Sequence, residues 1–406
     1  MDKKLIKREK YLKQIRQFYD SDLVKVITGI RRSGKSIILN EIMEEIKEKT
    51  NNIIYLNFEK VSDYAKAGTL SSLLQYVQDN RKEGKCYVFL DEVQEVVDWQ
   101  IAVKDLRTDN CSIFITGSNS KLLSGEITKY LSGRFVAIRV RPFVYKEILE
   151  YAKATGLQVD PNKYLVWGGF PGRFEVNTLE GTQMYLSDLD STIVLNDLIN
   201  RYKIKKQAIF IKIVNYILIN NARIFSIRSI HKYIKNDYPE ISIATVAKYV
   251  NYLKQAYIID EIPQYSTKAK KELSFYGKIY DADVALNSIR ISDGRYDLDH
   301  NLENIVYNEL IYMGYELTVF SNNGKEIDFR ATKDGKTYFI QVAYSVADPK
   351  AYDREFGAFK NIDKVNKVRL YIRNYNKGSI KCAENANFKL IPNYISDNPL
   401  VYIKSK

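Results

Sequence analysis

Long apolar runs are missing from the 406-residue sequence, and none approaches the roughly eighteen residues that span a bilayer. Residues 1–4 lead into charged sequence and not into the apolar core of a signal peptide. We therefore expect a cytoplasmic protein that makes no membrane contact.

Cysteine and histidine are scarce, with three and two residues respectively. Cys86 and Cys111 open apolar, strand-like runs, Cys382 stands alone, and no C-x-x-C pair occurs. This pattern argues against a disulfide-stapled fold and against a zinc site.

Charge is unbalanced, because 62 lysines and arginines face 49 acids and leave a formal net charge of +13. Such an excess suggests a polyanionic partner, although a lysine-rich and tyrosine-rich composition also follows from genomic base composition. The 45% hydrophobic and 27% charged content is typical of a globular protein, and the length predicts two or three domains.

Glycine is sparse too, but two glycines belong to the most informative stretch of the chain. Residues 29–36 read G-I-R-R-S-G-K-S and fit the phosphate-binding loop G-x-x-x-x-G-K-[ST] at every fixed position. The apolar run 23–28 before the loop predicts a strand, and residues 37–49, with isoleucines four apart, predict a helix. Strand, loop and helix are the context that this motif requires.

The loop predicts an ATP site with magnesium. Its backbone N–H groups and the start of the helix would surround the phosphates. Lys35 would reach the β- and γ-phosphates, and the Ser36 hydroxyl would bind Mg²⁺. The expected nucleotide-binding residues are Gly29, Ile30, Arg31, Arg32, Ser33, Gly34, Lys35, Ser36 and Ile37.

A second half of this site is expected after the apolar run 86–90, which delivers Asp91 and Glu92 to the carboxyl end of a strand. We expect Asp91 to hold Mg²⁺ through water and Glu92 to orient and deprotonate the attacking water.

Two further catalytic candidates follow in the sequence. The strand predicted at 112–116 leads into Asn119, which would position water or sense the γ-phosphate, as would Ser118 if the register slips; a plain polar turn is the alternative. Arg134 is a candidate arginine finger, and a structural salt bridge is the equal alternative.

These motifs together resemble the AAA-type ATPases, specifically the group of bacterial and archaeal ATPases with a restriction-endonuclease-like C-terminal domain. The resemblance covers nearly the whole chain and rests on residues 29–36, 90–94, 116–120, 132–134 and 168–172. It implies a parallel-sheet α/β core at 1–145, a helical lid at 146–203 and a homo-oligomer in which Arg134 acts across an interface.

Residues 204–298 form the most basic segment, and up to residue 290 they carry twice as many cations as acids. Helical patterns at 206–220, 226–235 and 242–255, followed by two strand-like runs, predict a winged helix. In the third helix Val246, Val250 and Leu253 would form the core stripe, while Lys248 and Tyr249 would face outward. The expected DNA-contacting residues are Lys248, Lys268, Lys270 and Lys271.

The last segment, 299–406, resembles the α+β nuclease core written P-D…(D/E)-x-K. Asp328 fits its metal-binding aspartate, and Glu303 or Glu309 fits a helix carboxylate. Gln341 and Ala343 stand where the second acid and the lysine belong, so we expect an inactive domain unless a displaced lysine such as Lys336 substitutes.

These features predict a Mg²⁺-dependent ATPase that is associated with DNA through a basic winged helix. A nucleotide-driven switch or chaperone-like module that holds a protein partner is the alternative. An ATP-regulated nuclease is the third hypothesis.

Overall fold

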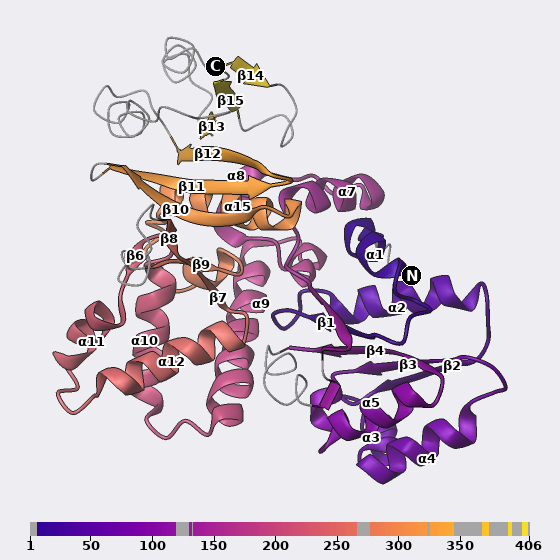
Figure 1. The fold of residues 1–406 in the computed structure, drawn as a ribbon. Helices are drawn as coiled ribbons and strands as arrows, with labels where there is room; N and C mark the ends of the chain where they lie inside the picture. The colour runs from indigo at the N-terminus through magenta and orange to yellow at the C-terminus, as the bar shows by residue number, and fades with distance from the viewer. Residues whose placement is uncertain are drawn as a thin grey trace. The chain divides into compact units, whose positions relative to one another are not determined.

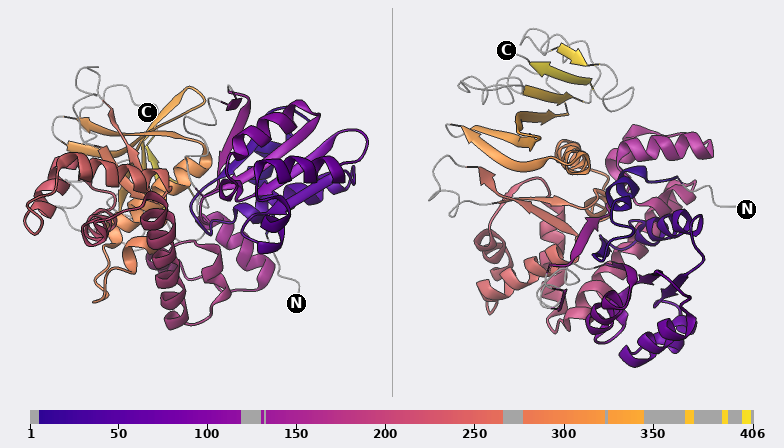
Figure 2. Two further views of the ribbon diagram at one scale, coloured as in Figure 1. Left: turned by 90° about the horizontal axis from the view of Figure 1, so that it is seen from below. Right: turned by 45° about the vertical axis from the view of Figure 1, so that its right-hand side comes forward.

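The computed structural model describes residues 6–118, 130–131, 133–265, 277–322 and 325–344, together with strands at 368–372, 389–391 and 400–404 (Figures 1 and 2). The chain divides into an N-terminal unit, Met1–Pro142 with Gln255–Tyr257, and a C-terminal unit, Phe143–Lys254 with Ile258–Lys406. None of the helices in these described ranges is long and apolar enough to cross a membrane.

The N-terminal unit is built on a five-stranded parallel sheet in the order β2-β3-β4-β1-β5. The strands are β1 Val24–Thr28, β2 Ile53–Asn57, β3 Cys86–Asp91, β4 Cys111–Gly117 and β5 Phe135–Arg139. The helices are α1 Glu9–Arg16, α2 Lys35–Lys47, α3 Val61–Ala67, α4 Leu70–Asn80, η1 Val93–Glu95 and α5 Trp99–Thr108. This sheet confirms the α/β core that the sequence predicts.

Helices cover both faces of this sheet, with α1 and α2 on one face and α3, α4 and α5 on the other (Figure 1). Every residue of β1 and β4 is therefore buried, which explains why these strands read as continuous apolar runs. Since β3, β4 and β1 are neighbours, the segments that follow their carboxyl ends meet at one edge of the sheet.

The C-terminal unit begins with a helical segment whose breaks fall where the sequence places glycine and proline. Its helices are α7 Tyr145–Thr155, α8 Pro161–Trp167, η3 Pro171–Glu175, α9 Leu179–Thr192 and η4 Ile193–Asn200. Gly156 ends α7 with φ 77°, and Asp160 caps α8 by accepting the N–H of Asn162 at 2.8 Å.

Three helices and a small antiparallel sheet in the order β6-β9-β7 follow. The elements are α10 Gln207–Ile219, β6 Ile224–Phe225, α11 Ile227–Lys235, α12 Ile243–Gln255, β7 Ile259–Ile262 and β9 Gly277–Asp281. Val246, Val250 and Leu253 are buried as predicted, but the prediction that Tyr249 is exposed is wrong. Its ring packs edge-on against Phe210 of α10, with 5.1 Å between the ring centroids.

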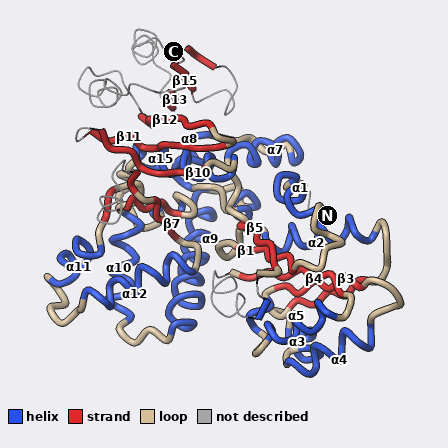
Figure 3. The backbone as a smooth tube through the Cα atoms, viewed as in Figure 1, coloured by secondary structure: helices blue, strands red, loops and turns tan. Residues whose placement is uncertain are grey.

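The final part combines α14 Ala285–Ser288 and α15 Leu298–Met313 with a mixed sheet (Figure 3). Within the described residues the strand order is β14-β15-β13-β12-β11-β10-β8. The strands are β8 Gln264–Tyr265, β10 Glu316–Asn322, β11 Lys325–Lys333, β12 Lys336–Ala343, β13 Val368–Ile372, β14 Lys389–Ile391 and β15 Leu400–Lys404. Val306 and Leu310 of α15 form a core with Phe329 and Ile340 of the sheet.

The glycine-rich stretch 168–172 connects the early helices of this unit to the segment that follows β9. The Asp283 carboxylate accepts the N–H groups of Gly169 at 2.6 Å and Ala285 at 2.9 Å. A Cβ on Gly168 would lie 1.5 Å from Asp283 Oδ1, and φ at Gly168 is +62°. This motif therefore has a structural role, because no larger residue fits at Gly168.

Candidate nucleotide-binding site

The loop 29–36 connects β1 to α2 and turns sharply at its first residue. Gly29 has φ +143°, and a Cβ there would lie 2.1 Å from the carbonyl oxygen of Val140. Only glycine fits this position, which explains the first fixed position of the motif. Helix α2 begins at Lys35, so its free N–H groups and positive dipole end lie at the loop.

Lys35 lies across the loop with only 4% of its surface exposed. Its ammonium donates to the carbonyl of Ile30 at 3.3 Å and lies 3.6 Å from Glu92 Oε1. The structure thus brings together the two residues, 57 positions apart in sequence, to which the motif analysis assigns phosphate binding and water activation.

The carboxylate of Asp91 is buried at the same edge. Ser36 Oγ donates to Asp91 Oδ1 at 3.1 Å, and Thr116 donates to the same oxygen. Tyr55 and Asn57 donate to Oδ2 at 3.3 and 3.4 Å. Burial raises the pKa of Asp91, and the hydrogen bonds from Thr116 and Ser36 oppose that rise. The hydrogen bond from Ser36 to Asp91 thus places the two predicted magnesium ligands next to each other.

Sequence reasoning did not identify Tyr55, Asn57 or Thr116. The sequence did carry a signal for two of these residues, because Asn57 and Thr116 lie at or near the carboxyl ends of the predicted strands beside β3. Only the order of strands in the sheet decides which strand ends are neighbours.

Glu92 follows β3 in the left-handed conformation, with φ 51°. Its N–H donates to Thr116 Oγ1 at 2.8 Å, and its carboxylate accepts from Gln94. A non-glycine residue with positive φ is held there by its surroundings, and such strain is typical of functional positions. The backbone bond to Thr116 and the contacts with Gln94 and Lys35 orient the carboxylate toward the loop.

Asn119, with Ser118 as its alternative, and Arg134 are the remaining catalytic candidates. Ser118 is buried directly after β4, whereas Asn119 lies outside the described residues and stays a prediction. Arg134 is exposed and precedes β5, and its carbonyl accepts the N–H of Val24, the first residue of β1.

Because β5 and β1 are parallel, Arg134 lies at the amino edge of the sheet, about 16 Å of strand from the phosphate loop. The Arg134 backbone is therefore remote from the phosphate loop of its own chain. An arginine finger contributed to a neighbouring copy stays a prediction.

Arg8 is a residue of this site that sequence reasoning missed. It lies just before α1, is 3% exposed, and donates from Nη1 to the Ser33 carbonyl at 2.8 Å and from Nη2 to the Arg141 carbonyl at 2.9 Å. Arg8 therefore ties the phosphate loop to the segment through which the chain leaves the N-terminal unit. An arginine in a charged N-terminal stretch carries no local signal for this role.

Glu303 and Asp328, two of the acids predicted for a nuclease-like site, come together in the C-terminal unit, but around a lysine and with Glu326, which was not predicted. The Lys278 ammonium lies 2.7 Å from Glu303 Oε1, 2.7 Å from Glu326 Oε1 and 3.4 Å from Asp328 Oδ1. Tyr280 also donates to Glu303, at 2.6 Å. Within the described residues, no group of three or more histidines, cysteines and acids is arranged to hold a metal ion.

The other residues assigned to the nuclease-like site lie in different places. Glu309 is not part of the cluster and accepts the N–H of Tyr145 instead, at 2.6 Å. Lys336 is exposed at the start of β12, at the opposite end of that strand from Gln341 and Ala343, and its role as the displaced lysine stays a prediction. Gln341 follows Ile340, which pairs with Phe329, and is thus beside Asp328.

Of the predicted DNA-contacting residues, Lys248 is exposed on α12, with its ammonium 5.8 Å from the centroid of the Tyr252 ring. Lys268, Lys270 and Lys271 lie outside the described residues, so their role stays a prediction.

Comparison with known proteins agrees with the N-terminal architecture. Residues 21–149 match the family model of an AAA domain, and residues 159–292 match a domain of unknown function (DUF8612). A solved Walker-type ATPase of Pyrococcus abyssi has a similar fold, with a TM-score of 0.50 and 15% identity, over 70% of this chain and 96% of that one. The nuclease-like domain expected at 299–406 stays a prediction.

Two uncharacterised proteins are similar over most of their length. One, from Haemophilus influenzae, is 34% identical over 360 residues, which cover 86% of this chain and 89% of that protein. The other, from Methanocaldococcus jannaschii, is 31% identical over 379 residues, which cover 87% of this chain and 82% of that protein. The chain therefore belongs to the family of these two uncharacterised proteins, and it carries an AAA domain with a P-loop fold in its N-terminal unit.

Proposed function

We propose that this protein is an ATPase that uses Mg²⁺. The observation that carries the proposal is the meeting of the phosphate loop, the Ser36–Asp91 pair and the Lys35–Glu92 pair at one edge of the sheet. A nucleotide hydrolase needs a phosphate cradle, a cation site and a base at such an edge.

Each residue has a separate role in this proposal. When ATP binds, the Lys35 ammonium leaves the Glu92 carboxylate and contacts the phosphates. The Glu92 carboxylate is then free to take a proton from the attacking water. Ser36 and Asp91 would hold Mg²⁺, which supplies positive charge to the phosphate oxygens. Arg8 keeps Ser33 in place by holding its carbonyl.

ATP turnover by purified protein tests this proposal, with Lys35→Ala and Glu92→Gln as inactivating variants. Lys47→Ala and Glu95→Gln are matched controls, because both side chains are exposed. Lys47 lies on α2, the helix that begins at Lys35, and Glu95 lies in η1, which directly follows Glu92. We expect turnover to fall at least a hundredfold in the first pair and to stay unchanged in the second, an effect of about 3 kcal/mol on the barrier. Turnover by Lys35→Ala and Glu92→Gln at the level of the native protein would refute the assignment.

We further propose that residues 204–298 form a winged helix that binds duplex DNA through the phosphate backbone. The order α10, β6, α11, α12, β7, β9, with β9 between the two other strands, supports this topology. The exposed Lys248 on α12 and the excess of cations in the segment support a polyanionic partner.

Measuring ATP turnover with and without duplex DNA at low and high salt distinguishes this proposal from a protein-binding switch. DNA stimulation that fades with salt and weakens in Lys248→Ala, but not in Lys49→Ala at an exposed lysine just after α2, supports DNA association. Turnover that is indifferent to DNA at both salt concentrations supports the protein-partner alternative.

A further inference from the structure

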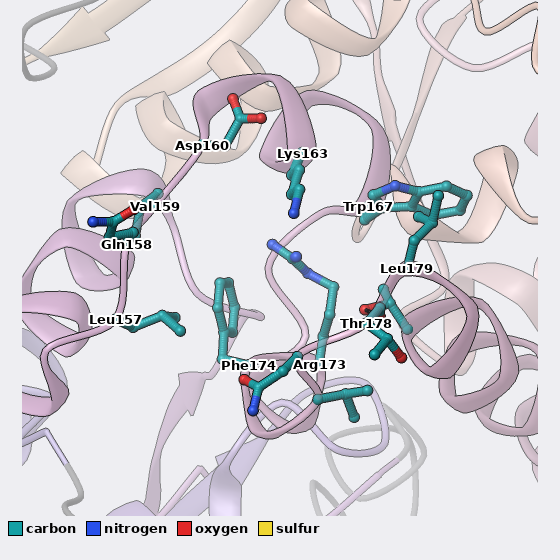
Figure 4. A pocket seen from close by; sticks show the side chains of 13 residues that line it. Leu157, Gln158, Val159, Asp160, Lys163, Trp167, Arg173, Phe174, Thr178 and Leu179 are labelled. Carbon is teal, nitrogen blue, oxygen red and sulfur yellow. Dashed lines mark hydrogen bonds between the residues drawn. The ribbon is translucent and has the colours of Figure 1, made fainter.

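A pocket of about 130 Å³ opens within the C-terminal unit between the segment that follows α7, helix α8, η3 and the start of α9 (Figure 4). Its apolar lining includes Leu157, Trp167, Phe174 and Leu179. A cavity of similar size, about 150 Å³, holds benzene, so this pocket suits a ligand with few heavy atoms and not a nucleotide.

Two cations converge in this small space. Figure 4 shows the Lys163 amine pointing away from Asp160 and toward the Arg173 guanidinium. Arg173 is only 8% exposed, and its guanidinium carbon lies 4.1 Å from the centroid of the Phe174 ring. Like charges that approach each other in a partly apolar pocket repel, and an anion between them removes that cost.

Hydrogen bonds fix the position of the Arg173 guanidinium. Arg173 donates from Nε and Nη2 to the Gly168 carbonyl at 3.0 and 2.7 Å, which fixes the plane of the guanidinium and leaves Nη1 without a bond to this carbonyl. In the part of the chain that the structure describes, neither Arg173 nor Lys163 forms an ion pair with a carboxylate.

Nearby acids have other partners. Asp160 accepts the N–H of Asn162, and both oxygens of Asp283 accept backbone N–H groups, from Gly169 and Ala285. Burial lowers the pKa of Arg173, and the charge of Asp283 partly opposes this.

We propose that this pocket binds a small organic carboxylate. Its anionic head lies between Lys163 and Arg173, and its apolar body contacts Trp167 and Phe174. The planar guanidinium with its fixed N–H directions matches a carboxylate, and the apolar lining favours an organic acid over inorganic phosphate. This site is independent of the proposed ATPase reaction, since none of its residues belongs to the N-terminal unit.

Tryptophan fluorescence reads out this pocket directly, because the chain has two tryptophans and only Trp167 lines the pocket. Trp99 is buried in the core of the N-terminal unit, and Trp99→Phe leaves Trp167 as the sole reporter. We expect hexanoate to change the Trp167 emission saturably, with a Kd on the order of 1 mM. Hexanol, which lacks the charge, and inorganic phosphate, which lacks the apolar body, are expected to bind at least tenfold more weakly.

Substitutions complete the test. Lys163 is exposed, so Lys163→Met should fold normally and weaken hexanoate binding about tenfold or more. Lys153→Met, at an exposed lysine of α7, is the matched control and should bind like the native protein. The proposal is overturned if hexanoate gives no saturable change, if hexanol or phosphate binds as tightly, or if Lys163→Met binds hexanoate as the native protein does.

Discussion

Replacing Lys278 with methionine should destabilise the C-terminal unit strongly. The Lys278 side chain is 5% exposed, and the side chains of Glu303 and Asp328, at 10% and 8%, share its ammonium with the more exposed Glu326. Methionine keeps the length of the side chain and removes its charge, so two buried acids lose their counter-ion. Breaking a buried ion pair in this way costs about 3–5 kcal/mol.

The loss should depend on pH in a defined direction. Burial and the neighbouring Asp328 raise the pKa of Glu303 to about 8, while Lys278 opposes that rise. Without the lysine, the buried acids bind protons in the folded state that the unfolded state releases above about pH 4.3. Stability that rests on a raised carboxyl pKa is present at low pH and is lost as the pH rises, so Lys278→Met should lose less at pH 5 than at pH 8.

Urea unfolding followed by circular dichroism at pH 5 and pH 8 measures this effect. Lys336→Met is the matched control, because this lysine is exposed at the start of β12. Adding Glu303→Gln and Asp328→Asn to Lys278→Met should recover part of the loss at pH 8, since the uncompensated charges are removed. A change of less than about 1 kcal/mol at both pH values would show that the cluster is not held together by charge.

Three further outcomes are expected in the N-terminal unit. Burial lowers the pKa of Lys25 to about 7, so above this pH the folded state has released a proton that the unfolded state keeps up to about pH 10.4. The free energy of unfolding measured in urea should therefore rise by about 2 kcal/mol between pH 7 and 9, and Lys25→Met should abolish that rise. Gly29→Ala places a Cβ 2.1 Å from the Val140 carbonyl and should abolish ATP binding in calorimetry, whereas unchanged affinity would contradict the observed loop geometry. Arg8→Met removes two charge-assisted hydrogen bonds and should weaken ATP binding about tenfold, whereas Lys13→Met on exposed α1 surface should not.

Much of the N-terminal unit was readable from sequence. The strand before residue 29, the loop, the helix after it and the acid pair at 91–92 each depend on periodicity and spacing over a few residues. Such local signals survive in any tertiary context, because the phosphate loop needs its glycine and lysine whatever surrounds it.

Local patterns were less reliable where a residue's partner is distant. Periodicity placed Tyr249 outside, but a packed Phe210 made that side of α12 part of the core. The sequence around Arg134 carries no sign that the parallel pairing of β5 with β1 places its backbone at the opposite end of the sheet from the phosphate loop.

The charged sites show most clearly what the sequence determined and what only the tertiary structure determined. The sequence alone determined which residues are candidates for binding phosphate, because that motif lies in one continuous loop. Only the tertiary structure decided that Lys278 neutralises Glu303 and Asp328, that Arg8 holds Ser33, and that Lys163 faces Arg173. The physical reason is that electrostatic and hydrogen-bond partners are chosen by distance in space, and chain topology, not sequence separation, sets that distance.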